Sequence, residues 1–181
     1  MSSGVIRPRA GGQTDFFRDW RHRFVFLEGG WASGKTWSGA RKLLALHLHN
    51  SADADGQPTR VMSAIVAPTY ANAKDFCIPE FLAACEDANL PTVWKSAAKE
   101  FHFPGYPVAP VIVRTADAAE RITGWEVGAF WGDEVARWKE DSENPKNDAL
   151  TQIQGRLRAP KARIRQGFFT YTNEGLSLIH I

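Results

Sequence analysis

The octapeptide Gly29-Gly30-Trp31-Ala32-Ser33-Gly34-Lys35-Thr36 fits the pattern G-x-x-x-x-G-K-[ST]. This pattern predicts a loop that binds the phosphates of a nucleoside triphosphate. Its glycines allow successive backbone N–H groups to curve around the phosphates. We expect Lys35 to reach the β- and γ-phosphates and the Thr36 hydroxyl to ligate Mg²⁺. All eight residues are therefore candidates for nucleotide binding, and Lys35 is also a candidate catalytic residue.

The segments on either side of the octapeptide favour this interpretation. Residues 23–27 (RFVFL) form a short apolar run that is typical of a buried strand. After the octapeptide, apolar residues recur at helical spacing, at Trp37, Ala40, Leu44 and Leu48. A strand, a glycine loop and a helix in this order bring the positive end of the helix dipole to the phosphate site. The alternative, a glycine-rich turn before a core helix, explains neither the lysine nor these flanks.

Length and composition indicate an ordinary soluble domain. The chain has 181 residues, of which 44% are hydrophobic and 23% are charged, enough for one domain with a core. Its apolar runs are too short to span a membrane, so no membrane partner is expected. Cys77 and Cys85 lack a metal-ligand pattern and are expected to be buried thiols in a reducing compartment.

Charge is distributed unevenly along the chain. Residues 1–50 carry eight basic and three acidic side chains, residues 51–150 carry nine and sixteen, and residues 151–181 carry five and one. Basic faces of this kind can contact nucleic acid, and the cluster Lys161, Arg163 and Arg165 is a candidate for following DNA phosphates. Taken alone, such charge runs are more often a simple solvated surface.

The coarse pattern alternates strands with helices, which predicts an α/β fold with a mainly parallel sheet and helices on both faces. Beyond residue 50 we expect strands at 61–67, 101–103, 110–113, 128–132 and 168–171. We expect helices at 71–87 and 149–157, and a surface loop or exposed helix at 138–148. In the first of these helices, Phe76 and Cys77 are expected to share one broad apolar face with Ala73, Phe81 and Leu82.

The pair Asp133-Glu134 ends an apolar run, Ala129-Phe130-Trp131-Gly132. An aspartate at the end of a strand beside a phosphate loop can hold Mg²⁺, so Asp133 is a candidate metal ligand together with Thr36. The adjacent glutamate can orient and deprotonate an attacking water. Glu134 is therefore the candidate general base, which indicates hydrolysis of the nucleotide.

Two weaker signals lie near the ends of the chain. Gln13 precedes the first strand, and its amide can both donate to and accept from an adenine edge. A solvated loop glutamine is the alternative. Thr172 and Asn173 follow the last strand, where a polar residue can sense the γ-phosphate and pass its loss to a moving part.

Seven segments, in their order and spacing over residues 5–175, resemble the ATPase half of a tailed-phage terminase large subunit. They are residues 11–17, 28–36, 67–69, 121–124, 131–134, 155–158 and 172–173. The resemblance implies a P-loop NTPase of the additional-strand, catalytic-glutamate class. It implies that Gln13 reads adenine, that Lys35 and Thr36 act in the P-loop, and that Asp133 and Glu134 are the Walker B pair. It also implies that Thr172 and Asn173 couple ATP hydrolysis to DNA movement.

The same resemblance implies partners and a location. Members of the family form a ring at the portal of an empty capsid, act with a small terminase subunit, and drive double-stranded DNA inward. The expected location is the cytoplasm of a bacterial host. Some relatives carry an arginine inside the P-loop, where this chain has Trp31-Ala32-Ser33. We therefore expect an arginine from a neighbouring copy, with Arg121 as the catalytic candidate and Arg156 and Arg158 as alternatives.

The end of the chain departs from the resemblance. Residues 176–181 (LSLIHI) resemble a translated sequencing adaptor, so we expect residues 1–175 to be the ATPase domain and the tail to be non-native. A natural apolar tail is the alternative. The nuclease domain of the family is not expected here, and nuclease activity is therefore not assigned.

Two other functions stay open from the sequence. One is a helicase-like nucleic-acid ATPase. The other is a nucleotide-binding assembly module that is inactive as an isolated fragment.

Overall fold

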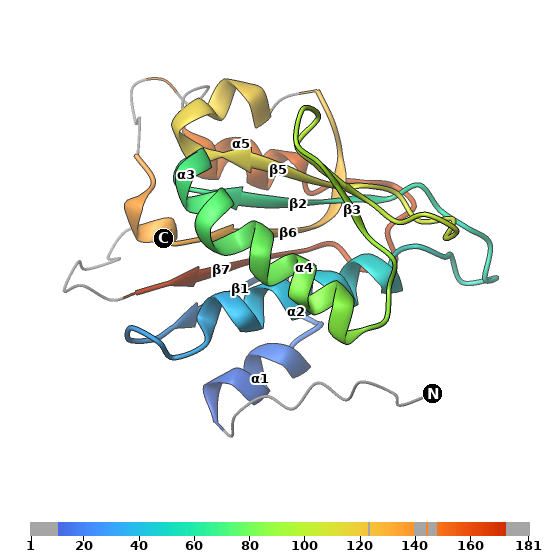
Figure 1. Ribbon diagram of the computed structural model, residues 1–181, viewed down its shortest axis with the longest axis horizontal. Coiled ribbons are helices and arrows are strands. Elements are labelled where there is room, and N and C mark those ends of the chain that lie inside the picture. Colours follow the sequence, from blue (N-terminus) through green and yellow to red (C-terminus); the bar gives the residue numbers. More distant parts are fainter. Residues whose placement is uncertain (1–10, 123, 140–143, 145–147, 173–181) are drawn as a thin grey trace.

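The chain folds into a seven-stranded sheet with helices on both faces (Figure 1). The computed structural model describes residues 11–122, 124–139, 144 and 148–172. Asn173, the tail 176–181 and most of the charged segment 138–148 lie outside the described residues. The strands are β1 (Phe24–Glu28), β2 (Met62–Ala67), β3 (Val93–Lys95), β4 (Glu100–His102), β5 (Val111–Thr115), β6 (Val127–Asp133) and β7 (Gln166–Tyr171).

Strand order confirms the predicted additional-strand class. The order is β1-β7-β6-β2-β5-β4-β3, so β7 lies between the strand before the glycine loop and the strand that ends at Asp133. All pairings among β1, β7, β6, β2 and β5 are parallel, whereas β4 pairs antiparallel with both β5 and β3. Because β1, β7 and β6 are parallel neighbours, their carboxyl ends lie along one edge of the sheet.

One face of the sheet is covered by α1 (Gly12–Arg18), α2 (Lys35–His49) and α4 (Ile78–Asp87) (Figure 1). Its core includes Leu43, Phe81, Trp131 and Phe168, all with essentially no exposed surface. The glycine at position 39 allows α2 to approach β6 closely, because a Cβ there would lie 2.4 Å from Trp131 Cε2. This contact fixes the start of α2 beside the end of β6.

The other face is covered by α5 (Ala149–Arg156) and the 3-10 turns η2 (Ala116–Ile122) and η3 (Val135–Arg137). Ile122, Phe130, Ile153 and Phe169 are buried there. The Asp148 side chain caps the start of α5, because it accepts hydrogen bonds from the N–H groups of Leu150 and Thr151. The prediction of helices on both faces is thus confirmed.

The helix expected over 71–87 contains a π-helical turn, which corrects one expectation. The run consists of α3 (Tyr70–Asn72), the π turn η1 (Ala73–Cys77) and then α4. A π turn holds one more residue than an α turn and therefore rotates the helix face. Cys77 is buried as expected, but Phe76 is 57% exposed and is not part of the apolar face. Strand β3 was not predicted at all.

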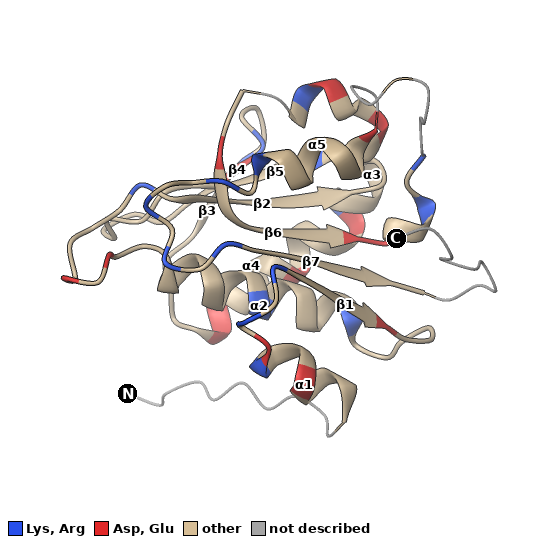
Figure 2. Cartoon of the chain, turned by 180° about the vertical axis from the view of Figure 1, so that it is seen from behind, with Lys and Arg blue, Asp and Glu red and all other residues tan. Residues whose placement is uncertain are grey.

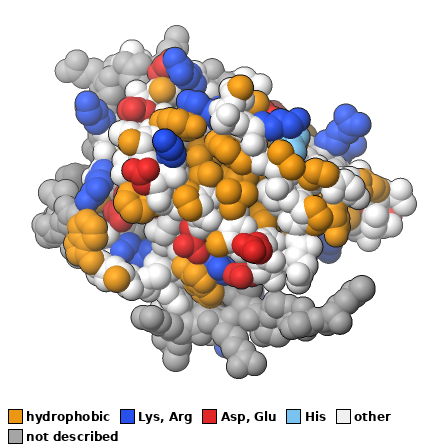
Figure 3. All heavy atoms as spheres, viewed as in Figure 1, with side chains coloured by type: hydrophobic (Ala, Val, Ile, Leu, Met, Phe, Trp, Pro, Cys, Tyr) orange, Lys and Arg blue, Asp and Glu red, His pale blue; other side chains and the backbone are white. Residues whose placement is uncertain are grey.

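Figure 3 shows the surface over α4 and the β3–β4 hairpin. Apolar side chains lie near the centre of this face, with acidic and basic side chains around them. Exposed large apolar residues of the chain include Phe76, Val93 and Tyr106. Within the described residues, no helix is both long enough and apolar enough to cross a membrane.

Candidate nucleotide site

A cavity of about 540 Å³ lies at the carboxyl ends of β1, β7 and β6. It brings together two parts of the sequence that were predicted separately. Residues 31–36 of the glycine loop line it, and so do Asp133, Glu134 and Thr172. Ligands of open parallel sheets bind at this edge, because loops and helix N-termini converge there. The other described lining residues are Trp37, Asn72, Phe76, Glu80 and Arg137.

The backbone of the glycine loop has the geometry of an anion site. Gly34 has φ +80°, and a Cβ there would lie 2.9 Å from Gln13 Nε2, so a side chain would be both strained and crowded. Helix α2 begins at Lys35, and its first internal bond runs from Ser38 N–H to Gly34 O (2.9 Å). The N–H groups of Lys35, Thr36 and Trp37 therefore precede that first bond and lie next to the cavity.

Two side chains of the loop also suit an anionic ligand. Lys35 Nζ donates to Gly30 O (2.8 Å), which folds the ammonium over its own loop and leaves two further N–H donors. Ser33 Oγ is buried and has no protein partner. An unpartnered buried hydroxyl is uncommon, and a polar ligand in the cavity would supply the missing partner. Gly29, the first residue of the loop, does not line the cavity, and its N–H donates to Tyr171 O (3.2 Å).

The Asp133 carboxylate is buried and held on both sides. Thr170 Oγ1 donates to Oδ1 (2.6 Å), and Cys77 Sγ donates to Oδ2 (3.4 Å). Trp131 Nε1 in turn donates to Thr170 Oγ1 (2.8 Å). Burial raises the pKa of Asp133, while the bonds from Thr170 and Cys77 oppose that rise. Burial also raises the pKa of the Cys77 thiol well above its usual value, so Cys77 remains a donor.

Glu134 follows in an unusual backbone conformation, with φ 46° and ψ 49°. For a residue with a side chain, this left-handed region is uncommon and often marks a functional position. The carboxylate of Glu134 accepts two hydrogen bonds from Thr172, from Oγ1 (2.9 Å) and from the backbone N–H (3.2 Å). The candidate base and the candidate coupling residue are thus in direct contact.

Gln13 lies in the first turn of α1 rather than in a loop. Its Nε2 donates to Ser33 O (2.8 Å) and contacts Gly34 O at 3.4 Å. The side chain therefore lies against the back of the glycine loop, and it is not among the residues that line the cavity.

The three arginines suggested by the sequence lie outside this cavity. Arg121 is 72% exposed and lines a separate hollow of about 250 Å³ with Lys99 and Arg114. Arg156 ends α5, and Arg158 pairs with Glu126 at 3.0 Å. A catalytic role for Arg121 therefore stays a prediction that needs a neighbouring copy.

Sequence reasoning missed several residues of the site. Arg137 lines the cavity three positions after Glu134, and an arginine that close to a carboxylate pair was an available signal. Phe76 reaches the cavity from the π turn and Glu80 from the first turns of α4, and only the three-dimensional structure brings them there. Glu80 pairs with Arg41 Nη1 at 2.6 Å, and the same guanidinium also pairs with Asp87.

The oxygen donors that line the cavity suit Mg²⁺. Mg²⁺ prefers oxygen ligands and usually takes only one or two from the protein, the rest coming from phosphates and water. Thr36 and Asp133 supply a hydroxyl and a carboxylate that line the same cavity. Within the described part of the chain, no cluster of three or more His, Cys, Asp or Glu side chains could hold a metal by itself.

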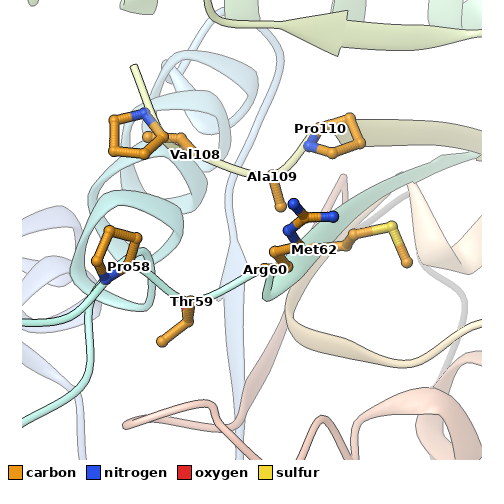
Figure 4. Close-up of a pocket in the computed structure, with 8 residues that line it drawn as sticks. Pro58, Thr59, Arg60, Met62, Val108, Ala109 and Pro110 are labelled. Carbon is orange, nitrogen blue, oxygen red and sulfur yellow. The ribbon is translucent and has the colours of Figure 1, made fainter.

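A second cavity, of about 560 Å³, lies at the opposite edge of the sheet. It is formed where β2 and β5 begin, and Figure 4 shows proline and aliphatic side chains around it. Arg60 is the single charged side chain among the described residues that line it. Its described lining residues include no carboxylate, and the hydroxyl of Thr59 is used in a bond to Asn50 O. The candidate active site is therefore the cavity at the carboxyl edge.

Figure 2 shows how charge is arranged relative to the two edges. Basic residues lie along loops near the amino ends of the strands, whereas acidic residues lie at the carboxyl end of β6. Lys161 and Arg163 are exposed on the connection before β7. Arg165 is partly engaged there, since its Nε donates to Ala159 O at 3.1 Å. Arg41 and Lys42, by contrast, are buried inside the domain.

Comparison with known proteins gives matches at the level of structure. No protein-family model and no curated protein sequence matches the chain. The large terminase of a thermophilic bacteriophage superposes with a TM-score of 0.68 at 13% identity, over 88% of this chain and 38% of that one. The same thermophilic-phage protein has been solved in complex with ADP and with ATP-γ-S.

Two further structures agree. The large terminase ATPase domain of Thermus phage P74-26 superposes with a TM-score of 0.64 at 16% identity, over 94% of this chain and 66% of that one. The HK97 bacteriophage large terminase gives 0.60 at 14% identity, over 92% of this chain and 33% of that one. The chain thus spans little more than a third of the thermophilic-phage protein. It shares its fold with phage large terminases, over a region that in the P74-26 protein is the ATPase domain.

Proposed function

We propose that this chain is the ATPase domain of a phage large terminase, which hydrolyses ATP with Mg²⁺ to drive double-stranded DNA into a capsid. The observation that carries the proposal is the meeting of the glycine loop with Asp133 and Glu134 in one cavity. The shared fold with large terminases supports the same conclusion, as do the nucleotide complexes of the thermophilic-phage protein.

Binding is assigned to the glycine loop and the start of α2. The backbone N–H groups at residues 33–37 and the Lys35 ammonium would surround the phosphates. The Ser33 hydroxyl, which has no protein partner, would find an acceptor there. Thr36 and Asp133 would hold Mg²⁺, which would supply positive charge against the phosphate oxygens. Gln13 would recognise adenine from behind the loop.

Hydrolysis is assigned to Glu134. Its carboxylate would accept a proton from the attacking water, and its position is set by the two hydrogen bonds from Thr172. Because Thr172 directly follows β7, movement of this strand end would alter the orientation of the base. This contact gives the proposed coupling role of Thr172 a physical route, and Asn173 is proposed to share it by resemblance.

The larger assembly is proposed on the same likeness. We assign residues 1–175 to an ATPase domain and propose that it works in a ring of copies, with portal and small subunit, in the bacterial cytoplasm. The exposed basic loops at the amino edge, with Lys161 and Arg163, are proposed to contact DNA phosphates.

Binding and DNA dependence test this proposal together. Wild-type chain should bind ATP in the presence of Mg²⁺, and Lys35→Ala should weaken binding at least about tenfold because the phosphates lose their cationic partner.

Linear duplex DNA should stimulate turnover more than single-stranded DNA. Stimulation by single strands alone would support a helicase-like ATPase. Tight binding with background turnover at every protein concentration would support an assembly module.

A further inference from the structure

Arg137 lines the nucleotide cavity but belongs to neither the glycine-loop motif nor the carboxylate pair. It ends the 3-10 turn η3, three residues after the candidate base. Its backbone N–H donates to Glu134 O (2.9 Å), which closes the turn. Buried neighbours fix the backbone on both sides. Val135 is buried before it, and Trp138 after it donates from Nε1 to Asp133 O (3.0 Å).

The Arg137 guanidinium lies over Trp31 of the glycine loop, with Cζ 5.9 Å from the ring centroid. This separation is within the range of a cation–π contact. Trp31 is 74% exposed, so the core does not explain its place in the loop. The contact joins the loop to the turn that carries Glu134 and holds a cation at the mouth of the cavity.

Charge in the cavity indicates what the cation is for. Among its described lining residues, Lys35 and Arg137 are basic, and Asp133, Glu134 and Glu80 are acidic. Glu80 and Asp87 share Arg41, so the cations that line the cavity do not outnumber its carboxylates. A nucleoside triphosphate adds several negative charges, and Lys35 is one point charge. A guanidinium can bind two phosphate oxygens at once and cannot lose its charge.

We propose that Arg137 contacts the terminal phosphate of the bound nucleotide from within the same chain and stabilises the charge that develops during transfer, with Trp31 as its positioning residue. The assignment rests on the proposed function. Its place beside Glu134, rather than beside Gln13, puts it at the phosphate end of the site. A cation that acts in this way contributes more in the transition state than in the ground state.

ATP turnover and the affinities for ADP and for ADP with aluminium fluoride test the role of Arg137. Arg137→Ala should lower kcat about 100-fold, in the range seen when a transition-state donor is removed. It should weaken the binding of ADP with aluminium fluoride at least about tenfold. The affinity for ADP alone should stay within about twofold of wild type, because ADP lacks the terminal phosphate. Arg137→Lys should recover part of kcat. Lys95→Ala, on the exposed edge strand β3, removes a cation far from the cavity and is the control, expected to behave as wild type.

Trp31 is tested through the same quantities. Trp31→Ala should lower kcat, Trp31→Phe should largely retain it, and the double variant with Arg137→Ala should be no worse than Arg137→Ala alone. The proposal is overturned if Arg137→Ala turns over ATP and binds the fluoride complex within twofold of wild type. If wild type binds ATP without hydrolysing it, the proposed function fails. In that case, a larger loss of affinity for ATP than for ADP in Arg137→Ala supports the contact with the terminal phosphate, and equal losses overturn it.

Discussion

Glu134 and Thr172 are joined by two hydrogen bonds, one to each oxygen of the carboxylate, from the hydroxyl at 2.9 Å and the backbone N–H at 3.2 Å. The two residues are 38 positions apart and directly follow neighbouring parallel strands. A base held by two donors from one residue has a defined orientation. Any displacement of the end of β7 must therefore either move the carboxylate or break these bonds.

Removing the hydroxyl of this pair should affect catalysis more than binding. Thr172→Val keeps the shape and the backbone bond but loses the 2.9 Å bond, so kcat should fall on the order of tenfold while KM changes less than about twofold. Thr172→Ser retains the hydroxyl and is the matched control, expected within about twofold of wild type. Steady-state ATP hydrolysis measures both values. A Thr172→Val enzyme with unchanged kcat would show that the contact does not orient the base.

Thr170 should control the protonation of Asp133. Burial raises the pKa of this carboxyl and the Thr170 hydroxyl opposes the rise, so Thr170→Val should raise the pKa further. Asp133 must be ionised to hold Mg²⁺, and the acid limb of kcat/KM should therefore move to higher pH. The variant also leaves Trp131 Nε1 and Asp133 Oδ1 without this partner, which should cost about 1–3 kcal/mol of stability.

A pH profile of ATP hydrolysis between pH 5 and 8, with thermal unfolding alongside, measures both effects of Thr170→Val. Thr170→Ser keeps the hydroxyl and should retain the wild-type acid limb. An acid limb that stays in place in the valine variant would remove Thr170 from this role.

Gln13 offers a test of base recognition. Its amide nitrogen contacts the carbonyls of Ser33 and Gly34, so the side chain connects α1 to the glycine loop. If Gln13 recognises adenine as proposed, Gln13→Ala should weaken ATP binding about tenfold and reduce the preference for ATP over GTP. Competition binding with the two nucleotides measures the preference. Equal losses for ATP and GTP would show that Gln13 supports the loop without reading the base.

His47 should make stability depend on pH. It is buried between Ser63 Oγ and Ala109 O, both at 2.9 Å, and burial lowers its pKa to about 4 from 6.5. The native state therefore binds this proton less tightly than the unfolded state. Stability from His47 is fully present above the unfolded pKa and is lost as pH falls from about 6.5 to 4, by about 3 kcal/mol.

Chemical unfolding at several pH values measures the His47 contribution. His47→Gln should be less stable near pH 7 and should show a shallower loss of stability between pH 6.5 and 4. An identical slope in the two proteins would exclude His47 as the source.

The sequence located the glycine loop and the carboxylate pair, which line one cavity in the structure, but it missed other residues that line the same cavity. The glycine loop, Asp133 and Glu134 are local patterns whose residue types follow from phosphate and metal chemistry. The placement of these carboxylates beside the loop followed from the rule that parallel strands share a carboxyl edge. The structure confirms that fold, including the strand inserted between β1 and β6.

Residues that reach the site through tertiary packing could not be predicted in the same way. Phe76 is displaced toward the cavity by a π turn, and helical periodicity assumes an unbroken α-helix. The Cys77 contact with Asp133 depends on the same turn. Strand β3 has three residues and two of them are exposed, so it carried too little apolar signal. Arg137 was adjacent to a recognised motif, but its place in the cavity and its contact with Trp31 follow only from the structure.

The most direct test of the account is single-site removal of the proposed base. Wild-type chain with Mg²⁺ and ATP should release phosphate catalytically. Glu134→Gln should lower kcat at least about 100-fold while ATP affinity stays within about threefold, because the amide retains the shape but cannot accept the proton. Glu126→Gln, an exposed carboxylate paired with Arg158, is the control and should match wild type. Hydrolysis that persists undiminished in Glu134→Gln would contradict the central claim.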